Sequence, residues 1–258
     1  MDAFIIAGGV PGPEDPLYPF ALGKPKAMID VAGKPMSQWV LDAVCGAKQI
    51  DQVVIVGLED DCGLRGTKPL HFIPDQGGMF DNARAGLDEL LKINPSDEQA
   101  LVLPGDTPAI TSQIIESRIE QSEGNDADFD YTVIKREVME ARYPGASRTY
   151  VKLKDVELCG GDMHVVRPSL VTDRELWERL MAGRKNILKQ AALIGFDTLF
   201  LLLTRSLTLD GAQKLISKRL GLVGVATLSP YAEVGMDADK PFQLEILRRE
   251  LASAGSVA

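Results

Sequence analysis

The stretch that decides the fold is AFIIAGG at residues 3–9, in which a short apolar run ends directly in two glycines. It predicts a buried strand that runs into a tight turn at Gly8-Gly9. Apolar runs at Val53–Val56 and Ala100–Leu103 predict two more strands. Amphipathic helices are expected between and after these strands, over residues 36–47, over residues 80–91 and after an N-cap at Thr111. This alternation predicts an α/β fold in which helices cover both faces of a parallel sheet.

The second half of the chain has a different pattern. Phe129–Lys135 and Thr149–Arg167 predict extended segments joined by turns, which could add antiparallel strands at one edge of the sheet. The pattern is mainly helical over residues 173–220 and returns to a strand at Leu222–Leu228. Pro241 fits the first turn of a final helix. No linker, repeat or low-complexity block divides the chain, so residues 1–258 are expected to form a single domain.

Charge and cysteine content exclude several classes of function. The 28 Lys and Arg residues against 37 Asp and Glu, a net charge of −9, argue against a nucleic-acid-binding protein. Three widely spaced cysteines suit a reducing compartment better than a disulfide scaffold. The most apolar late stretch, Ala191–Thr204, is shorter than the roughly 20 residues of a membrane span, and the first residues lack the features of a signal peptide. We therefore expect a soluble cytoplasmic protein with no membrane partner.

Two kinds of candidate site residue follow the predicted strands. Asp106 comes directly after the strand at 100–103, where a carboxylate is well placed to bind a hard cation, although a turn aspartate is the alternative. The backbone of Gly8-Gly9 could approach a phosphate, or form a tight turn with no ligand. Asp237 and Asp239 precede the final helix, which Asp239 could also simply cap.

Four elements taken together resemble the MobA-like NTP transferase family, nucleotidyltransferases with a GT-A-like fold. In chain order, the elements are Gly8-Gly9, Lys24-Pro25-Lys26 with Gly33-Lys34-Pro35, Gly105-Asp106, and Asp237-Ala238-Asp239-Lys240-Pro241. The resemblance implies the Rossmann-like GT-A nucleotide-diphospho-sugar transferase fold, with a mainly parallel central sheet, a small antiparallel extension and a helical excursion in the C-terminal half. It also implies an enzyme that uses Mg²⁺ (or Mn²⁺) to transfer NMP from an NTP to a small phosphorylated acceptor, releasing pyrophosphate.

The resemblance divides the single domain into a nucleotide-binding half at 1–125, an acceptor-side half at 126–235 with a helical insertion at about 173–220, and a closing metal-binding segment at 236–258. It implies that Asp106 and Asp239 bind the metal, with Asp237 a close competitor, and that Lys26 contacts the triphosphate and acts in catalysis beside Asp106. The other residues implied to bind nucleotide are Ala7, Gly8, Gly9, Lys24, Gln76 and Asn82.

The acceptor side is implied to involve Gly161 and Asp162, in a segment that is often Gly-Gly-Asn in the family, with a turn aspartate as the alternative. Arg148 and Lys152 belong to a locally basic stretch that could meet a phosphorylated acceptor, or simply form a solvated strand face. The sequence does not set the oligomeric state, and a homodimer remains open.

One departure from the family keeps a non-catalytic function open. The loop after Gly9 has no basic residue before Lys24, whereas the family usually has an arginine that clamps pyrophosphate. Lys24 could substitute, pyrophosphate could be held less tightly, or activity could be lost, which would leave a non-catalytic nucleotide-binding regulator. A GT-A glycosyltransferase with a nucleotide-sugar donor is the other alternative. The chain has two histidines, so a Ser-His-Asp site is hard to build. His71 is expected to be structural, and His164 is expected to be packed or exposed, although it could face the acceptor.

Overall fold

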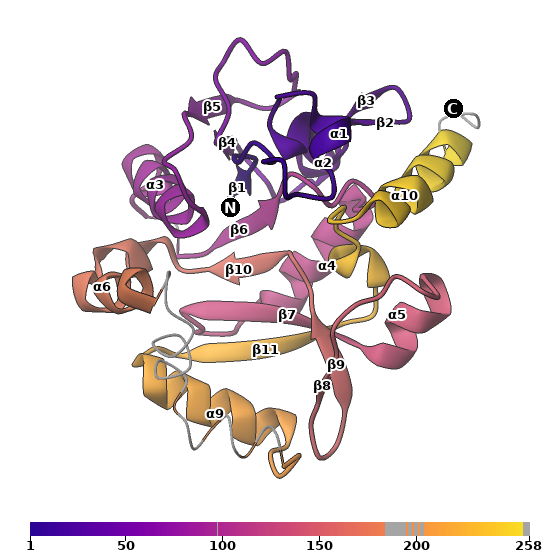
Figure 1. Cartoon of the computed structure of the whole chain (residues 1–258). Coiled ribbons are helices and arrows are strands. Elements are labelled where there is room, and N and C mark those ends of the chain that lie inside the picture. The colour runs from indigo at the N-terminus through magenta and orange to yellow at the C-terminus, as the bar shows by residue number, and fades with distance from the viewer. Residues whose placement is uncertain (97, 184–194, 196–197, 199–200, 202–203, 255–258) are drawn as a thin grey trace.

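The computed structural model describes residues 1–254, apart from 97, 184–194, 196–197, 199–200 and 202–203. Its N-terminal half contains four parallel strands in the order β5-β4-β1-β6 (Figure 1). Their bounds are β1 (Asp2–Ile6), β4 (Val53–Val56), β5 (Leu70–Ile73) and β6 (Ala100–Pro104). The predicted parallel sheet is therefore confirmed, and the stretch AFIIAGG supplies a strand inside it. A small separate hairpin is formed by β2 (Asp30–Val31) and β3 (Lys34–Pro35).

The C-terminal half continues the same sheet. β7 (Phe129–Lys135) is followed by a hairpin of β8 (Val151–Lys152) and β9 (Glu157–Gly160), which extends the sheet antiparallel as predicted. β10 (His164–Val166) does not lie at an edge, which corrects the expectation for its part of Thr149–Arg167. It lies between β6 and β7, antiparallel to both, so β7 again runs parallel to β6.

The last strand, β11 (Gly224–Ser229), pairs parallel with β7. Its outer side is covered by α9 (Leu209–Leu220), whose polar side chains bond to the strand's backbone. Gln213 Oε1 accepts from Ala226 N at 3.0 Å, and Ser217 Oγ accepts from Gly224 N at 3.1 Å. These bonds satisfy backbone groups that an open sheet edge would leave free for another chain.

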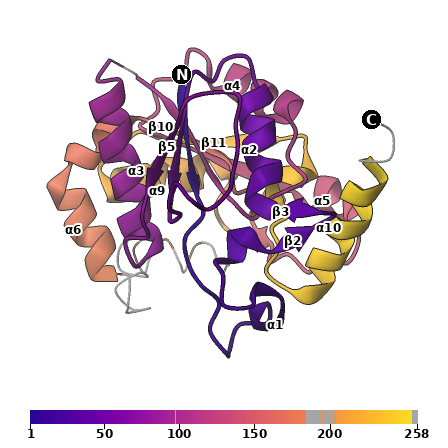
Figure 2. The same cartoon turned by 90° about the horizontal axis from the view of Figure 1, so that it is seen from above.

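Helices form a layer on each side of the sheet (Figure 2). One core packs the sheet against α2 (Met36–Gly46), α4 (Ser112–Ser122), α5 (Arg136–Arg142) and α10 (Pro241–Ala254). The other packs it against α3 (Met79–Ile93), α6 (Arg174–Gly183) and the 3₁₀ turn η2 (Pro168–Thr172). Shorter elements are α1 (Tyr18–Ala21), η1 (Lys26–Met28) and η3 (Ala232–Gly235).

Several local predictions are confirmed. The Thr111 side chain caps α4 by accepting from Ile114 N, and Pro241 is the first residue of α10. In the region expected to be mainly helical, α6 and α9 are present, whereas most of 184–203, including most of Ala191–Thr204, lies outside the described residues. Cys45, Cys62 and Cys159 are free thiols. Within the described part of the chain, no helix has the length and apolar character to cross a membrane.

Candidate functional site

The topology brings four aspartates to one edge of the sheet. Asp106 follows the carboxyl end of β6, and Asp162 precedes β10, which begins at that same edge because it runs antiparallel. β11 is parallel to β7 and ends there too, so the chain returns to this edge before Asp237 and Asp239. Carboxyl ends of parallel strands are where open α/β sheets bind ligands.

Lys26 joins the two carboxylates that were expected to bind metal. Its Nζ lies 2.6 Å from Asp106 Oδ2 and 2.5 Å from Asp239 Oδ1. Burial opposes the charge of Lys26, but both carboxylates outweigh burial and raise its pKa. Backbone bonds hold this arrangement: Lys26 N donates to Gly9 O at 3.0 Å, and Ala238 N donates to Asp106 O at 3.0 Å.

Asp237 belongs to a second, adjacent group. The Arg148 guanidinium pairs with Asp237 Oδ1 and lies 3.6 Å from Asp162 Oδ2. Burial, with neighbouring carboxylates, raises the pKa of Asp162 to about 8 and that of Asp237 to about 7, although Arg148 opposes both shifts. Burial also opposes ionisation of Asp239, but Lys26 outweighs it and lowers the pKa of Asp239. The structure therefore joins Asp239 to Asp106 through Lys26 and pairs Asp237 with Arg148, and which of the two binds the metal stays a prediction.

The glycine loop packs against the end of the neighbouring strand. Ala7 N donates to Val56 O at 2.7 Å, and Gly57, with φ +104°, lies so close that a Cβ there would be 2.1 Å from Gly8 N. Only glycine suits this close approach of two backbones. The loop that was expected to meet phosphates is thus held in place from the β4 side.

Gly57→Ala is expected to displace this loop. The substitution combines a positive φ with a backbone clash, so it should lower the free energy of unfolding by more than the about 1–3 kcal/mol of backbone strain alone. Gly63→Ala is the matched control, because Gly63 also has a positive φ of 90° but a Cβ there would meet nothing within 4 Å. Denaturant unfolding of both variants measures the difference. Equal losses in the free energy of unfolding would show that the close approach of Gly57 to Gly8 does not contribute to the effect.

Asn82 and Gln76 lie together beside the glycine loop. Asn82 is buried; its Oδ1 accepts from Gln76 N at 2.8 Å, and its Nδ2 donates to Asp75 Oδ1 at 2.7 Å. A Cβ on Gly8 would lie 2.6 Å from Asp75 Oδ1 and 2.8 Å from Asn82 Nδ2. The Asp75–Asn82 pair therefore directly adjoins the glycine loop. Asp75 was missed from sequence, although it lies next to Gln76 at the end of a strand that the sequence also left unassigned.

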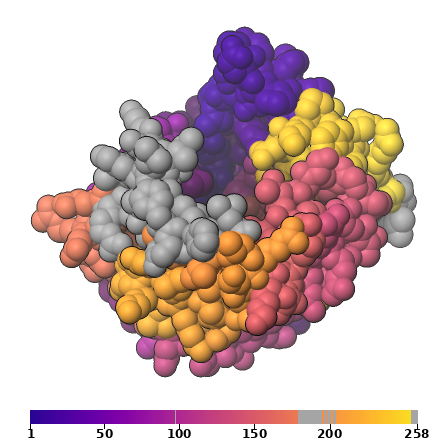
Figure 3. All heavy atoms as spheres, turned by 60° about the horizontal axis from the view of Figure 1, so that its bottom comes forward, coloured from indigo at the N-terminus to yellow at the C-terminus, as the bar shows by residue number. Residues whose placement is uncertain are grey.

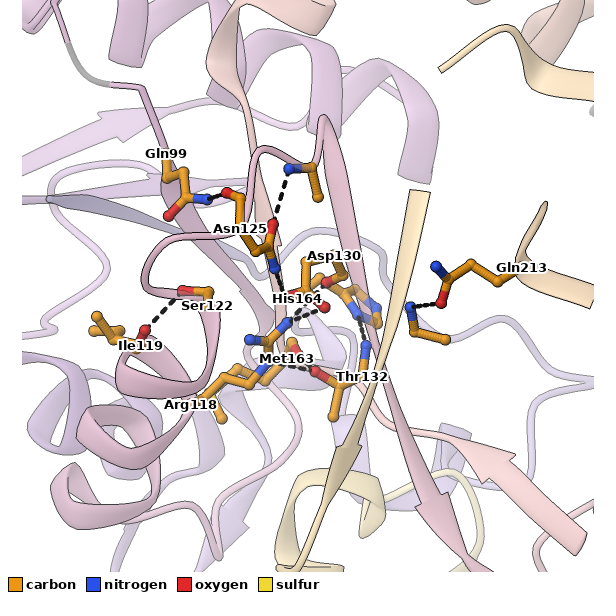
Figure 4. A network of polar contacts seen from close by, with 12 residues as sticks. Gln99, Arg118, Ile119, Ser122, Asn125, Asp130, Thr132, Met163, His164 and Gln213 are labelled. Atoms are coloured by element: carbon orange, nitrogen blue, oxygen red, sulfur yellow. Dashed lines mark hydrogen bonds and ion pairs between the residues drawn. The ribbon is translucent and has the colours of Figure 1, made fainter. Parts of the chain in front are cut away.

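Figure 4 shows a buried polar network that includes Arg118, Asp130 and Thr132. Arg118 and Asp130, 2% and 1% exposed, form an ion pair of 2.7 Å, and Arg118 Nε donates to Thr132 Oγ1 at 2.8 Å. Thr132 then holds the segment around Asp162: its hydroxyl donates to Met163 O, and its carbonyl accepts from Gly161 N at 2.9 Å. This network, which the sequence did not predict, fixes Asp162 relative to β7.

Both histidines have structural surroundings. His71 Nε2 is 3.2 Å from Gln52 Oε1. His164 Nδ1 accepts from Thr132 N at 3.2 Å, and its ring stacks on Tyr131 with centroids 4.6 Å apart. Burial, with the charge of Arg118 nearby, lowers the pKa of His164 to about 3. The prediction that neither histidine serves a Ser-His-Asp site agrees with these contacts.

The low pKa of His164 predicts a pH-dependent loss of stability. The unfolded chain binds a proton at about 6.5 and the folded protein only at about 3. Stability from this group is therefore complete above pH 6.5 and falls as the pH drops toward 3, by about 2 kcal/mol at pH 5. Arg118, Asp130 and Tyr131 are its charged or titratable neighbours, and other groups also titrate in this window. The measurement therefore compares denaturant unfolding of the wild type and His164→Asn at pH 7.5 and 5. Parallel losses in both proteins would contradict the assignment.

Two predicted basic residues, Lys24 and Lys152, are not in the carboxylate group. Lys24 is exposed before Pro25, and its role at a phosphate stays a prediction. Lys152 Nζ lies 3.3 Å from Glu157 Oε1, and Arg136 shares that carboxylate at 2.9 Å. The structure therefore ties Lys152 to the β8–β9 hairpin and leaves Arg148 as the cation beside Asp162.

The molecular surface is hollowed between the N-terminal residues and the C-terminal segment (Figure 3).

The donor atoms suit a hard divalent cation. Asp106 and Asp239 offer carboxylate oxygens, which Mg²⁺ and Mn²⁺ prefer. Within the described ranges, no three His, Cys, Asp or Glu side chains are arranged as a ready metal cage. Mg²⁺ often uses only one or two carboxylates together with substrate phosphates, so a two-carboxylate site fits it.

The architecture is the Rossmann-like α/β fold of nucleotidyltransferases. A CMP:2-keto-3-deoxy-manno-octonic acid synthetase solved with CTP shares it, with a TM-score of 0.59, 14% identity and coverage of 98% of this chain and 100% of that one. So does a 4-diphosphocytidyl-2C-methyl-D-erythritol synthase from Anaerococcus prevotii, with a TM-score of 0.59, 14% identity and coverage of 97% and 95%.

A hypothetical transferase from Thermus thermophilus is more similar, with a TM-score of 0.79, 29% identity and coverage of 94% of this chain and 98% of that one. Residues 19–194 match the MobA-like NTP transferase domain. The chain belongs to the MobA-like NTP transferase family, as its motifs predicted.

Proposed function

We propose that this protein is a Mg²⁺-dependent nucleotidyltransferase that moves NMP from an NTP to a small phosphorylated acceptor and releases pyrophosphate. The observation that carries the proposal is the convergence of Asp106 and Asp239 on Lys26 at the carboxyl edge of the sheet. Two carboxylates and one lysine at such an edge match the needs of phosphoryl chemistry, in which anions must be neutralised and aligned.

Asp106 and Asp239 would hold the divalent cation. Asp237, which is now paired with Arg148, is the alternative ligand. When bound, the cation neutralises phosphate charge and orients the triphosphate. Lys26 adds a point charge against the α-phosphate, where charge develops as an acceptor oxygen bonds to phosphorus and the bond to the pyrophosphate oxygen breaks. The backbone of Ala7, Gly8 and Gly9 would contact the phosphates and base, with Asn82, Gln76 and Lys24 completing the nucleotide site.

Gly161, Asp162 and Arg148 would form the acceptor side. Asp162 can accept a hydrogen bond from an acceptor hydroxyl, and Arg148 can meet a phosphate by exchanging one of its present carboxylate partners. Lys152 would contribute only if it left Glu157, from which its Nζ is now 3.3 Å.

A second candidate is a non-catalytic nucleotide-binding regulator. The loop at residues 10–23 favours it, because it is acidic rather than basic where pyrophosphate would leave. Asp15 in this loop accepts from Leu17 N at 2.7 Å and so serves the local turn.

A thermal-shift screen with ATP, CTP, GTP and UTP, each with and without Mg²⁺, tests the proposal. At a hundredfold excess over the dissociation constant, a bound NTP should add about 2.7 kcal/mol of stability, or roughly 5 °C or more in Tm, and should do so in the presence of Mg²⁺ only. A shift that ignores Mg²⁺, without turnover over an acceptor panel, would favour the regulator. A shift with nucleotide sugars alone, followed by nucleoside diphosphate release, would replace the proposal by a glycosyltransferase.

A further inference from the structure

The Lys26 ammonium lies where a divalent cation would have to lie. Its Nζ contacts Asp106 Oδ2 at 2.6 Å and Asp239 Oδ1 at 2.5 Å, and it thus bridges two carboxylates that lie far apart in the sequence. The side chains of Lys26 and Asp106 are about four-fifths buried, so water screens this contact only partly. One cation thus already neutralises the pair of oxygens that a metal would use.

A second cation cannot simply join the first. An ammonium and a divalent ion that share the same two oxygens would repel each other strongly over a few ångströms in a partly buried site. Metal binding at Asp106 and Asp239 therefore requires the ammonium to move away.

The neighbouring carboxylate is also already paired with a cation. Asp237 is paired with Arg148, and Arg148 also donates to Gly160 O at 3.2 Å, which anchors the guanidinium in place. No ready three-ligand cage exists among the described residues. The protein alone thus holds a weak divalent site whose main oxygens are already neutralised.

We propose that Lys26 is the exchangeable cation of this site: it holds Asp106 and Asp239 together in the nucleotide-free protein, and an arriving triphosphate draws its ammonium away and frees both carboxylates for the divalent cation. The inference rests on the proposed function, since it needs a triphosphate and a metal at this site. The consequence is coupled binding, in which metal and NTP each strengthen the binding of the other by the same factor.

Mn²⁺ binding to the full chain without nucleotide tests this inference, with the bound metal followed by electron paramagnetic resonance and water-proton relaxation. Lys26→Met removes the ammonium, and Lys26→Gln is a second variant in case the first folds poorly. Both should bind Mn²⁺ alone at least tenfold more tightly than the wild type. Lys92→Met is the matched control, because it deletes another lysine–carboxylate pair, 2.9 Å from Glu89, on the surface of α3. It should bind Mn²⁺ like the wild type.

The same measurement with α,β-methylene analogues of ATP, CTP, GTP and UTP separates the two ways of failing. If the wild type takes up Mn²⁺ with an analogue but the Lys26 variants bind Mn²⁺ alone no more tightly than wild type, the exchange is refuted and the proposed function stands. If no analogue gives a ternary complex with Mn²⁺ in any of these proteins, the proposed metal site fails, and the exchange fails with it. Adding Asp239→Asn to Lys26→Met should abolish the gain, and a retained gain would place the metal elsewhere.

Discussion

Asp106→Ala and Asp239→Ala are each expected to abolish NTP-dependent pyrophosphate release. Each substitution removes one of the two carboxylates that converge on Lys26, and with it half of the proposed ligand set for the metal. Metal coordination contributes several kcal/mol to the stability of such a transition state, so the loss in turnover should be about 10³-fold or more. Pyrophosphate release with the NTP selected by thermal shift, over a panel of phosphorylated acceptors, measures the effect.

Asp42→Ala is the control for these two variants. Asp42 also pairs with a lysine, Lys34, but on the exposed side of α2 and away from the carboxylate group. This variant should turn over like the wild type. Near-normal turnover in both Asp106→Ala and Asp239→Ala would end the metal assignment, whereas loss in Asp239→Ala alone would confine the metal to the C-terminal segment.

Arg118→Met is expected to cost about 3–5 kcal/mol in the free energy of unfolding. The substitution leaves the Asp130 carboxylate, which is 1% exposed, without its ion-pair partner in the core. It also removes the donor that fixes Thr132, which in turn holds the segment carrying Asp162. Urea unfolding measures the loss, and a higher KM for the acceptor would report a looser segment around Asp162, the proposed acceptor side.

The double variant Arg118→Met with Asp130→Leu separates the buried charge from the packing. Replacing a whole buried ion pair with apolar side chains is often nearly neutral, so the double variant should recover much of the stability. A loss below about 1 kcal/mol in Arg118→Met, or a double variant less stable than the single one, would contradict this account of the network.

The parallel part of the fold could be predicted because its signals are local. The runs at 53–56 and 100–103 are continuous and apolar, and they coincide with β4 and most of β6. β10 could not be placed, because three residues carry too little pattern to distinguish an edge from the middle of the sheet. Its position depends on pairing with β6 and β7, whose partner residues lie about 35 to 65 residues away along the chain.

In the candidate site, too, residues with a local sequence signal could be predicted and contacts between distant residues could not. Asp106 and Asp239 could be named because one follows a predicted strand and the other precedes a predicted helix, whereas Lys26 could be named only from the resemblance of Lys24-Pro25-Lys26 to the family. The pairing of Asp237 with Arg148 could not be predicted from sequence, because the two residues are 89 positions apart. Arg118 left one overlooked signal: it interrupts the apolar face formed by Ile114, Ile115 and Ile119 on α4, where a charge must have a buried partner.

The most direct test of the central claim follows the fate of the α-phosphate. The protein is incubated with Mg²⁺, a phosphorylated acceptor panel and NTP labelled at either the α- or the γ-phosphate. A nucleotidyltransferase should place the α-label in a new acceptor product and release the γ-label as pyrophosphate, and EDTA should stop both. An α-label that stays on free nucleotide for every NTP and acceptor, or a γ-label released as orthophosphate, would contradict nucleotidyl transfer at this site.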